Sequence, residues 1–285
     1  MKLIRLLVLL VSLGVVSHAA DFEGTIRWSF AIEITDPVMK KEMADAATQM
    51  ADPKMKEEMA EAKAALADPE MQAMMAQNPQ MKAMMEQQLA MMNKMQSGGG
   101  NPMENIFPKA MLLRYKAGKT LSTMEGGPMP MEVLNLPAES ATYLINRPAK
   151  TYSKLPDEKP PGVEKSTFTV TKTAETIRIL GYECVKYVVT ETAPATAADG
   201  GPARYLVWAS TDVPGLDTRA LAKVRFGQKG EANAFLGQID GVPLKMEITM
   251  PQARITMGAV SLKAESLADA LFTVPAGFVE KPVGF

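Results

Sequence analysis

The segment Phe22-Glu23-Gly24-Thr25-Ile26-Arg27-Trp28-Ser29-Phe30-Ala31-Ile32-Glu33-Ile34-Thr35 alternates apolar and polar residues over its whole length. A period of two places successive side chains on opposite faces of a β-strand. The segment therefore predicts a long strand with one buried and one solvated face. Trp28 is a candidate ligand contact on the buried face, although such a residue more often simply fills the core.

The same period returns in the second part of the chain, where Gly, Pro and Asn residues separate short alternating stretches. Because most of these stretches have only one apolar side, we expect an antiparallel sheet with one solvated face. Short helices are expected at 216–226 and at 267–271, the latter capped by Ser266. The predicted strands are 110–116, 120–125, 130–135, 140–146, 151–154, 168–173, 176–179, 184–192, 204–210, 244–250 and 253–264.

A methionine-rich segment, residues 36–97, follows the first strand, and a Gly-rich linker at 97–102 ends it. Four phrases of the form Asp/Asn-Pro-x-Met occur in it, beginning at Asp36, Asp52, Asp68 and Asn78. Asp and Asn accept hydrogen bonds from the free amides of a helix start, and Pro fits the first helical position. We therefore expect four short amphipathic helices, each with methionines on one face.

Three roles for these methionines remain open. They could pack the helices onto the sheet, or form an adaptable groove for an apolar partner, because Met is flexible and polarisable. They could also bind Cu(I), since thioethers are soft ligands and a Met-x-x-Met-Met spacing occurs twice. The same spacing follows from any amphipathic helix, so no metal site is assigned. The candidate ligand-binding residues are Met71, Met74, Met75, Met81, Met84, Met85, Met92, Met95, Trp28 and Trp208.

Residues 1–19 have the order of a secretory signal peptide: Lys2 and Arg5, a short apolar run, then small residues at Ala19 and Ala20. The apolar run is shorter than the roughly 20 residues that span a bilayer. We expect cleavage near Ala19 or Ala20, and a periplasmic or extracellular protein that does not span the membrane. Residues 20–285 are expected to form a single β-rich domain that the methionine-rich segment interrupts.

Composition argues against several classes of function. His18 is the only histidine and lies in the predicted signal peptide, and Cys184 is the only cysteine. The exported chain therefore lacks the residues for a His-dependent nucleophile, a His-ligated metal or a disulfide. A net charge of −1 gives no basic surface for nucleic acid. We expect a protein that is not an enzyme and that has no cofactor; Cys184 is interpreted as a small buried side chain.

Several phrases resemble those of an uncharacterised bacterial exported family, the domain of unknown function 4412. The most specific is Ile179-Leu180-Gly181-Tyr182-Glu183-Cys184-Val185-Lys186-Tyr187, which is similar to the family's I-x-G-Y-x-C-x-x-Y strand. The other phrases occur in the family's order: Phe22-Glu23-Gly24, Tyr143-Leu144-Ile145-Asn146, Lys150-Thr151-Tyr152, Arg204-Tyr205-Leu206-Val207-Trp208-Ala209 and Leu271-Phe272-Thr273-Val274-Pro275-Ala276-Gly277-Phe278.

The closing phrase and the strand-rich order also resemble the lipoprotein carriers LolA and LolB. That resemblance implies an α+β fold, a large curved antiparallel sheet or half-barrel that can hold acyl chains. The methionine-rich helical insertion after the first strand departs from those carriers. The leading hypothesis is a binding or carrier protein for a lipid, a lipoprotein acyl chain or an apolar peptide. The alternatives are a structural or interaction module of the cell envelope, and Met-based Cu(I) binding.

Overall fold

The computed structural model describes residues 22–54, 107–127, 131–156, 168–191, 203–213 and 234–282, together with residues 57, 60, 61, 64, 68 and 216. These residues form a sheet of twelve strands, the helix α1 (Pro37–Ala51) and the short 3-10 helices η2 (Pro137–Glu139), η4 (Ala234–Gln238) and η5 (Asp269–Phe272). Across these ranges, no helix combines the length and apolarity needed to cross a bilayer.

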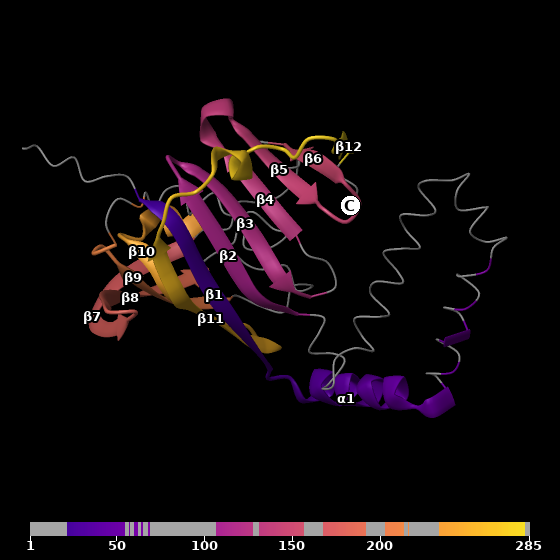
Figure 1. Ribbon diagram of the computed structural model, residues 1–285. Helices are drawn as coiled ribbons and strands as arrows, with labels where there is room; N and C mark the ends of the chain where they lie inside the picture. The colour runs from indigo at the N-terminus through magenta and orange to yellow at the C-terminus, as the bar shows by residue number, and fades with distance from the viewer. Residues whose placement is uncertain are drawn as a thin grey trace, which may run out of the picture.

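The long first strand, β1 (Glu23–Ile34), lies in the middle of the sheet. It pairs antiparallel with β2 on one side and with β11 on the other. The sheet order is β12-β6-β5-β4-β3-β2-β1-β11-β10-β9-β8-β7, so β1 joins two five-stranded meanders (Figure 1). The first meander consists of β2 (Pro108–Lys116), β3 (Lys119–Gly126), β4 (Met131–Leu136), β5 (Ala141–Asn146) and β6 (Thr151–Leu155).

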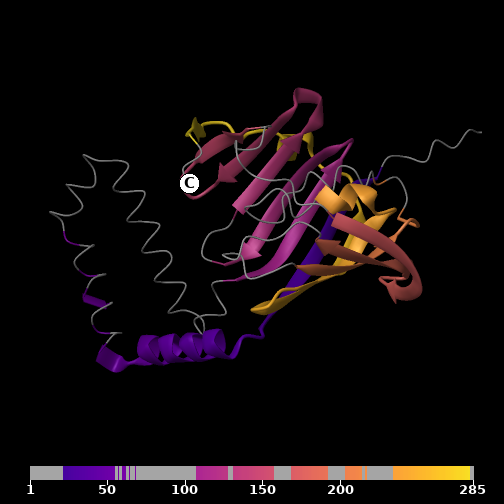
Figure 2. The same cartoon turned by 180° about the vertical axis from the view of Figure 1, so that it is seen from behind.

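The second meander completes a large, curved sheet that stays open. Its strands are antiparallel throughout, and only β12 (Val279–Glu280) pairs in parallel, with β6. Figures 1 and 2 show the sheet strongly bent, with one meander on either side of β1. The strands of this half are β7 (Phe168–Ile179), β8 (Tyr182–Glu191), β9 (Arg204–Ser210), β10 (Val242–Thr249) and β11 (Ala253–Ala264).

The turns between the first strands place several residues at positive φ. Ala117 and Gly118 join β2 to β3 with φ of 48° and 79°. A two-residue turn with both residues at positive φ matches the right-handed twist of the paired strands, so the strands predicted at 110–116 and 120–125 form a tight hairpin. At the end of β3, Gly126 and Gly127 also have positive φ. A Cβ on Gly126 would lie 2.9 Å from the backbone nitrogen of Lys109, so this position requires glycine.

The alternation of β1 separates two faces of the sheet. We call the face that carries Ile26 and Trp28 the inner face, and the opposite one the outer face. Ile26 and Trp28 are buried, Trp28 with only 1% of its surface exposed. The main core lies largely around this face, where the side chains of β1, β2 and β8 to β11 meet those of η4. The predicted one-sided burial of the first strand is therefore confirmed at its N-terminal half.

The outer face of the first meander is covered by the chain's own C-terminal segment. Leu267 and Phe272 are buried against Leu121, Leu134 and Ile145 in a second hydrophobic cluster. The segment continues to β12 beside β6. The sheet thus has covered regions on both faces, whereas the sequence led us to expect one solvated face. Alternation along a strand shows which side is apolar, but it does not reveal that a distant irregular segment will lie on the other side.

Two further expectations differ from the structure in detail. The stretches 168–173 and 176–179 form one strand, β7, with a register shift between Lys172 and Thr176 that accommodates the extra residues as a bulge. The short helix predicted at 267–271 begins later, as η5, and its N-cap position is Ala268 without a side-chain hydrogen bond, so Ser266 is not the cap. Of the helix predicted at 216–226, all but Leu216 lies outside the described residues.

Candidate functional site

The inner face is filled by the chain itself across β7 to β9. Phe235 of η4 is fully buried and its ring lies 5.4 Å from that of Phe168 and 4.8 Å from that of Tyr205, measured between centroids. Leu236 and Ile239 are buried in the same cluster. These side chains extend from the connection between β9 and β10 over the inner face. This part of the sheet therefore holds a packed core.

The inner face is less completely covered at the C-terminal end of β1. Phe30, Ile32 and Ile34 follow the buried Trp28 on this face, but all three are partly exposed. Their neighbours across the sheet include Ile255 of β11 and Ile248 of β10, which form one rung with Ile32 and are also partly exposed. We call Phe30, Ile32, Ile34, Ile248 and Ile255 the inner strip.

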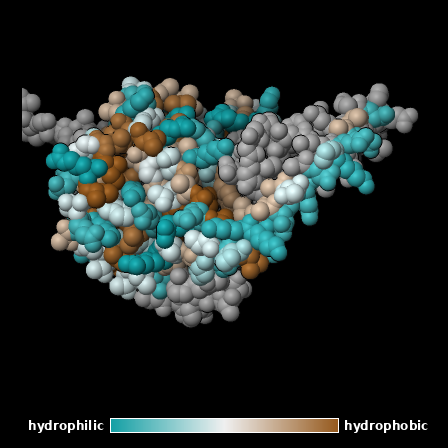
Figure 3. Space-filling model, turned by 90° about the horizontal axis from the view of Figure 1, so that it is seen from below, coloured by the Kyte–Doolittle hydropathy of each residue, from teal (hydrophilic) through white to brown (hydrophobic). Residues whose placement is uncertain are grey.

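The inner strip lies next to the point where the chain leaves the sheet. β1 ends at Ile34, and the Asp36 carboxylate caps α1 by accepting a 2.7 Å hydrogen bond from the Met39 amide. The helix start predicted at Asp36-Pro37 is confirmed. Seen from below in Figure 3, apolar residues gather on the sheet part of the molecule, whereas the helical part that extends to the right is mostly hydrophilic. The inner strip itself belongs to β1, β10 and β11.

The two tryptophans that the sequence suggested as ligand contacts lie on opposite faces. Trp28 is on the inner face, where its Nε1 donates a 3.2 Å hydrogen bond to the Pro243 carbonyl. Trp208 pairs with Lys245 and Lys186 on the outer face, and the two ammonium groups lie 4.5 and 5.9 Å from the centroid of its ring. The structure therefore does not bring the two residues into one site.

The eight candidate methionines between Met71 and Met95 lie outside the described residues. Cys184 does lie within them, fully buried on β8. Burial raises the pKa of its thiol to about 11. The thiol is therefore protonated at neutral pH, in agreement with its interpretation as a small buried side chain.

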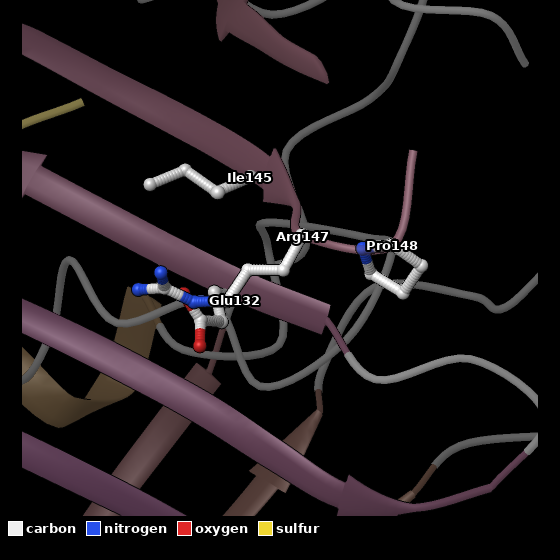
Figure 4. Close-up of a pocket in the computed structure, with 4 residues that line it drawn as sticks. All are labelled: Glu132, Ile145, Arg147 and Pro148. Atoms are coloured by element: carbon white, nitrogen blue, oxygen red, sulfur yellow. The ribbon is translucent and has the colours of Figure 1, made fainter. Parts of the chain in front are cut away.

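An open depression of about 360 Å³ lies on the outer face of the first meander (Figure 4). Glu132, Ile145, Arg147 and Pro148 line it. The Arg147 Nε donates a 2.8 Å hydrogen bond to the Glu132 carboxylate, which raises the pKa of the guanidinium. Because the two charges satisfy each other, this depression offers neither a free charge nor an extended apolar surface.

A comparison with known protein families identifies the family of this chain. The family model described as a domain of unknown function (DUF4412) matches residues 88–278. The chain belongs to this family. No curated protein sequence matches this DUF4412 chain. The family resemblance is thereby confirmed; the phrases from Tyr143 to Phe278 lie within the match, whereas Phe22-Glu23-Gly24 lies outside it.

Two solved structures are similar to the DUF4412 chain at low scores. LprF from Mycobacterium bovis shares 11% identity, with a TM-score of 0.25 over 64% of this chain and 96% of its own. The lipoprotein LppX of Mycobacterium tuberculosis shares 10% identity, with a TM-score of 0.25 over 66% of this chain and 100% of its own. TM-scores of 0.25 do not establish a shared fold.

The inner strip is the feature that sequence reasoning missed. The alternation of the first strand already contained Phe30, Ile32 and Ile34, but their partial exposure depends on how far the neighbouring strand extends. β2 pairs with β1 only as far as Ser29, so the last residues of β1 have a partner on one side alone. The apolar row of the first strand was visible in the sequence, and such a row becomes a candidate surface where it extends beyond a paired strand. The sequence did not reveal which strand would be that partner.

Proposed function

We propose that this DUF4412 protein is an exported, non-catalytic binding or carrier protein for apolar ligands, and that the inner strip is part of its ligand-contacting surface. The candidate ligands are a lipid, a lipoprotein acyl chain or an apolar peptide. The open, curved sheet would act as a half-barrel, and the signal-peptide pattern of residues 1–19 would direct export. The methionine-rich segment, including Met71, Met74, Met81 and Met84, would contribute further contacts as an insertion between β1 and β2.

The observation that carries the proposal is the partial exposure of five large apolar side chains in adjacent positions of the inner face. Leaving such side chains in contact with water costs free energy, at roughly 25 cal/mol for each Å² of apolar surface. Contiguous exposed apolar surface is uncommon on soluble monomers and is typical of binding sites. An apolar ligand would remove this surface from water.

The test uses Nile red, an uncharged apolar dye, with the full exported chain. We expect the wild-type protein to bind the dye, and Ile32→Glu to weaken that binding at least tenfold. Ala31→Glu is the matched control, because Ala31 is the neighbouring residue on the outer face and is exposed. It should change the affinity by less than twofold. Far-UV circular dichroism checks that both variants fold.

Native mass spectrometry of protein purified from its own host provides a second measurement. We expect a bound lipid or acylated peptide that is released on denaturation. A ligand-free wild-type protein that also fails to bind Nile red would refute the apolar-ligand function and leave the envelope module and Met-based Cu(I) binding as the remaining hypotheses. Equal loss of dye binding in Ile32→Glu and Ala31→Glu would show that the inner strip is not the contact surface.

A further inference from the structure

The hairpin of β7 and β8 ends in a turn of unusual composition. Leu180 and Gly181 form this two-residue turn with φ of 51° and 88°. Such turns favour Asn-Gly, because a large apolar residue is strained at positive φ. The other described residues that combine positive φ with a side chain are Ala117, Ser140 and Lys150. Those three are small or polar, so among the described residues Leu180 is the large apolar one in this conformation.

The same turn exposes apolar surface. We call residues 177–183 the hairpin tip. Within it, Leu180 is 43% exposed and Ile177 is 36% exposed. The other described large apolar side chains exposed to this degree are Val38, Met39, Val260 and Val279. Of these four, two are adjacent in the chain, and as successive residues of α1 they point in different directions. The hairpin tip thus gathers exposed apolar side chains at a turn that is ordinarily polar.

The hairpin tip extends past the neighbouring strand. β8 pairs with β9 from Val185 to Thr190, so the residues of β8 before Val185 lie beyond that pairing. β7 is the last strand of the sheet, and its outer edge has no strand partner in the part of the chain that the structure describes. A Cβ placed on Gly181 would meet no atom within 4 Å. Figures 1 and 2 show the hairpin at the margin of the molecule, on the far side from α1.

The base of the hairpin tip is anchored, and its charges balance. Ile179 and Tyr182, which pair across the hairpin, are partly buried and pack against the main core. On the other face, Arg178 and Glu183 pair in register and are both exposed. These are the charged residues of the tip, one of each sign. The tip therefore presents an apolar end on a fixed base, without a net charge of its own.

We propose that the hairpin tip docks the protein on a lipid surface, with Leu180 and Ile177 inserted among the head groups. A stable protein–protein interface buries about 800 Å² on each partner, far more than the side chains of a single turn supply. A bilayer interface needs no complementary pocket, because it is fluid and takes up a small apolar projection. Tyr182 suits the same boundary, since aromatic residues with a polar end are enriched where membrane meets water.

This docking goes beyond the proposed function and does not depend on it. Because the strands from β1 to β7 alternate in direction, the C-terminal end of β7 lies at the same end of the sheet as the N-terminal end of β1. The inner strip lies at the C-terminal end of β1. The hairpin tip and the inner strip are therefore at opposite ends of the strands, and docking through the tip leaves the strip accessible.

The experiment measures co-flotation of the full exported chain with phosphatidylcholine vesicles. We expect the wild-type protein to bind, and Leu180→Asn to weaken the binding at least fivefold. The same substitution should raise the melting temperature, because Asn tolerates positive φ and its polar side chain is readily hydrated. Ile177→Thr keeps a β-branched residue in the strand and should weaken vesicle binding at least threefold.

Val279→Asn is the matched control, because Val279 is 59% exposed but lies on β12 at the other edge of the sheet. It should change vesicle binding by less than twofold. Ile32→Glu alters the inner strip and should bind vesicles as the wild type does. Because the charges of the tip balance, about 30% phosphatidylglycerol in the vesicles, or a rise in NaCl from about 0.1 M to about 0.5 M, should change the affinity by less than twofold.

Failure of the wild-type protein to bind vesicles would overturn the proposal. So would equal losses in Leu180→Asn and Val279→Asn, or unchanged binding in folded Leu180→Asn and Ile177→Thr. Binding that requires the anionic lipid and disappears at high salt would show adsorption through charges elsewhere on the protein, which also overturns it. Nile red binding in the absence of vesicles tests the inner strip separately, so the two proposals can fail independently.

Discussion

At the scale of single residues, Trp28 makes the contact that joins β1 to the bulge of β10. Its Nε1 donates to the Pro243 carbonyl, and the ring is 1% exposed. We expect Trp28→Phe to lower the free energy of unfolding by about 2 kcal/mol, because the ring shrinks and a buried carbonyl loses its donor. Urea denaturation followed by far-UV circular dichroism measures this, since fluorescence would change with the loss of a tryptophan.

Trp208→Phe is the control for that prediction. Trp208 is 8% exposed and belongs to the main core, with the ammonium groups of Lys186 and Lys245 over its ring, and it makes no hydrogen bond among the described contacts. Trp208→Phe loses some packing and part of a cation–π attraction of roughly 0.5 to 1 kcal/mol, but it leaves no buried carbonyl without a donor, so its loss of stability should be smaller. A loss of stability in Trp208→Phe as large as that in Trp28→Phe would contradict the bridging role of Trp28.

Cys184 gives a prediction in the alkaline range. Its folded pKa is about 11, above the value of roughly 8.5 of an unfolded thiol. Because the pKa is higher in the folded state, the thiol of the unfolded chain ionises at a lower pH than that of the folded chain. The contribution of the thiol to the free energy of unfolding is therefore fully present below pH 8.5 and is lost as the pH rises toward 11. We expect Cys184→Ala to reduce this alkaline loss. A thiol-specific reagent at pH 8 should label the unfolded chain and spare the folded one; rapid labelling of native protein would contradict burial.

At the scale of structural elements, a group of charges joins the first strand to the C-terminal segment. The Glu23 carboxylate accepts a hydrogen bond from the Leu267 amide, and the Lys116 Nζ donates a 2.6 Å hydrogen bond to the Leu267 carbonyl. The same ammonium lies 3.2 Å from Glu23 and 3.2 Å from Asp269. These bonds fasten the segment where it begins to cover the outer face.

The charges around Glu23 predict that the stability of the fold decreases at acidic pH. The Leu267 amide, and then Lys116, lower the pKa of Glu23. A lowered folded pKa contributes stability above the unfolded value of about 4.3, and that stability is lost as the pH falls below it. We expect Glu23→Gln to lower the melting temperature at pH 7 and to flatten its decline between pH 5 and pH 3.

Glu33→Gln is the matched control, on the same strand. Its partner Arg254 is 3.6 Å away, and both side chains are more than half exposed, so this pair should contribute little. If both variants change the melting temperature and its acid dependence equally, the C-terminal segment is not fastened through Glu23.

At the scale of the whole molecule, the open sheet has β1 in its middle, and its strands come from both sides of the methionine-rich segment. We propose that this segment is an insertion, and we expect the sheet to fold without it. A Gly/Ser linker of about ten residues in place of residues 37–106 can return from the end of β1 to β2, since such a linker spans about 17 Å. Circular dichroism and thermal unfolding should match the full chain within a few degrees.

The deletion also tests the role of the methionines. A folded deletion variant that still binds Nile red would assign binding to the sheet alone, whereas loss of binding would place essential contacts in the removed segment. An insoluble or non-cooperative variant would show that the segment is part of the core, and it would refute its description as an insertion.

The sequence by itself determined what depends on neighbouring residues. The alternation of Phe22 to Thr35 predicted a strand with one buried face, Asp36-Pro37 predicted the start of α1, and the alternation at 110–116 and 120–125 predicted two neighbouring strands. Each of these follows from local backbone geometry and hydrogen bonding. The order of the strand phrases was enough to indicate the family, because order survives where individual residues vary.

Only the tertiary structure decided which strands become neighbours and what covers each face. It placed Trp28 and Trp208 on opposite faces, laid the C-terminal segment over the first meander, and left Phe30, Ile32 and Ile34 partly exposed at the end of β1. These features arise from contacts between residues far apart in the chain. A period of two indicates that a strand has an apolar side. Whether that side is buried depends on which distant segment of the chain packs against it.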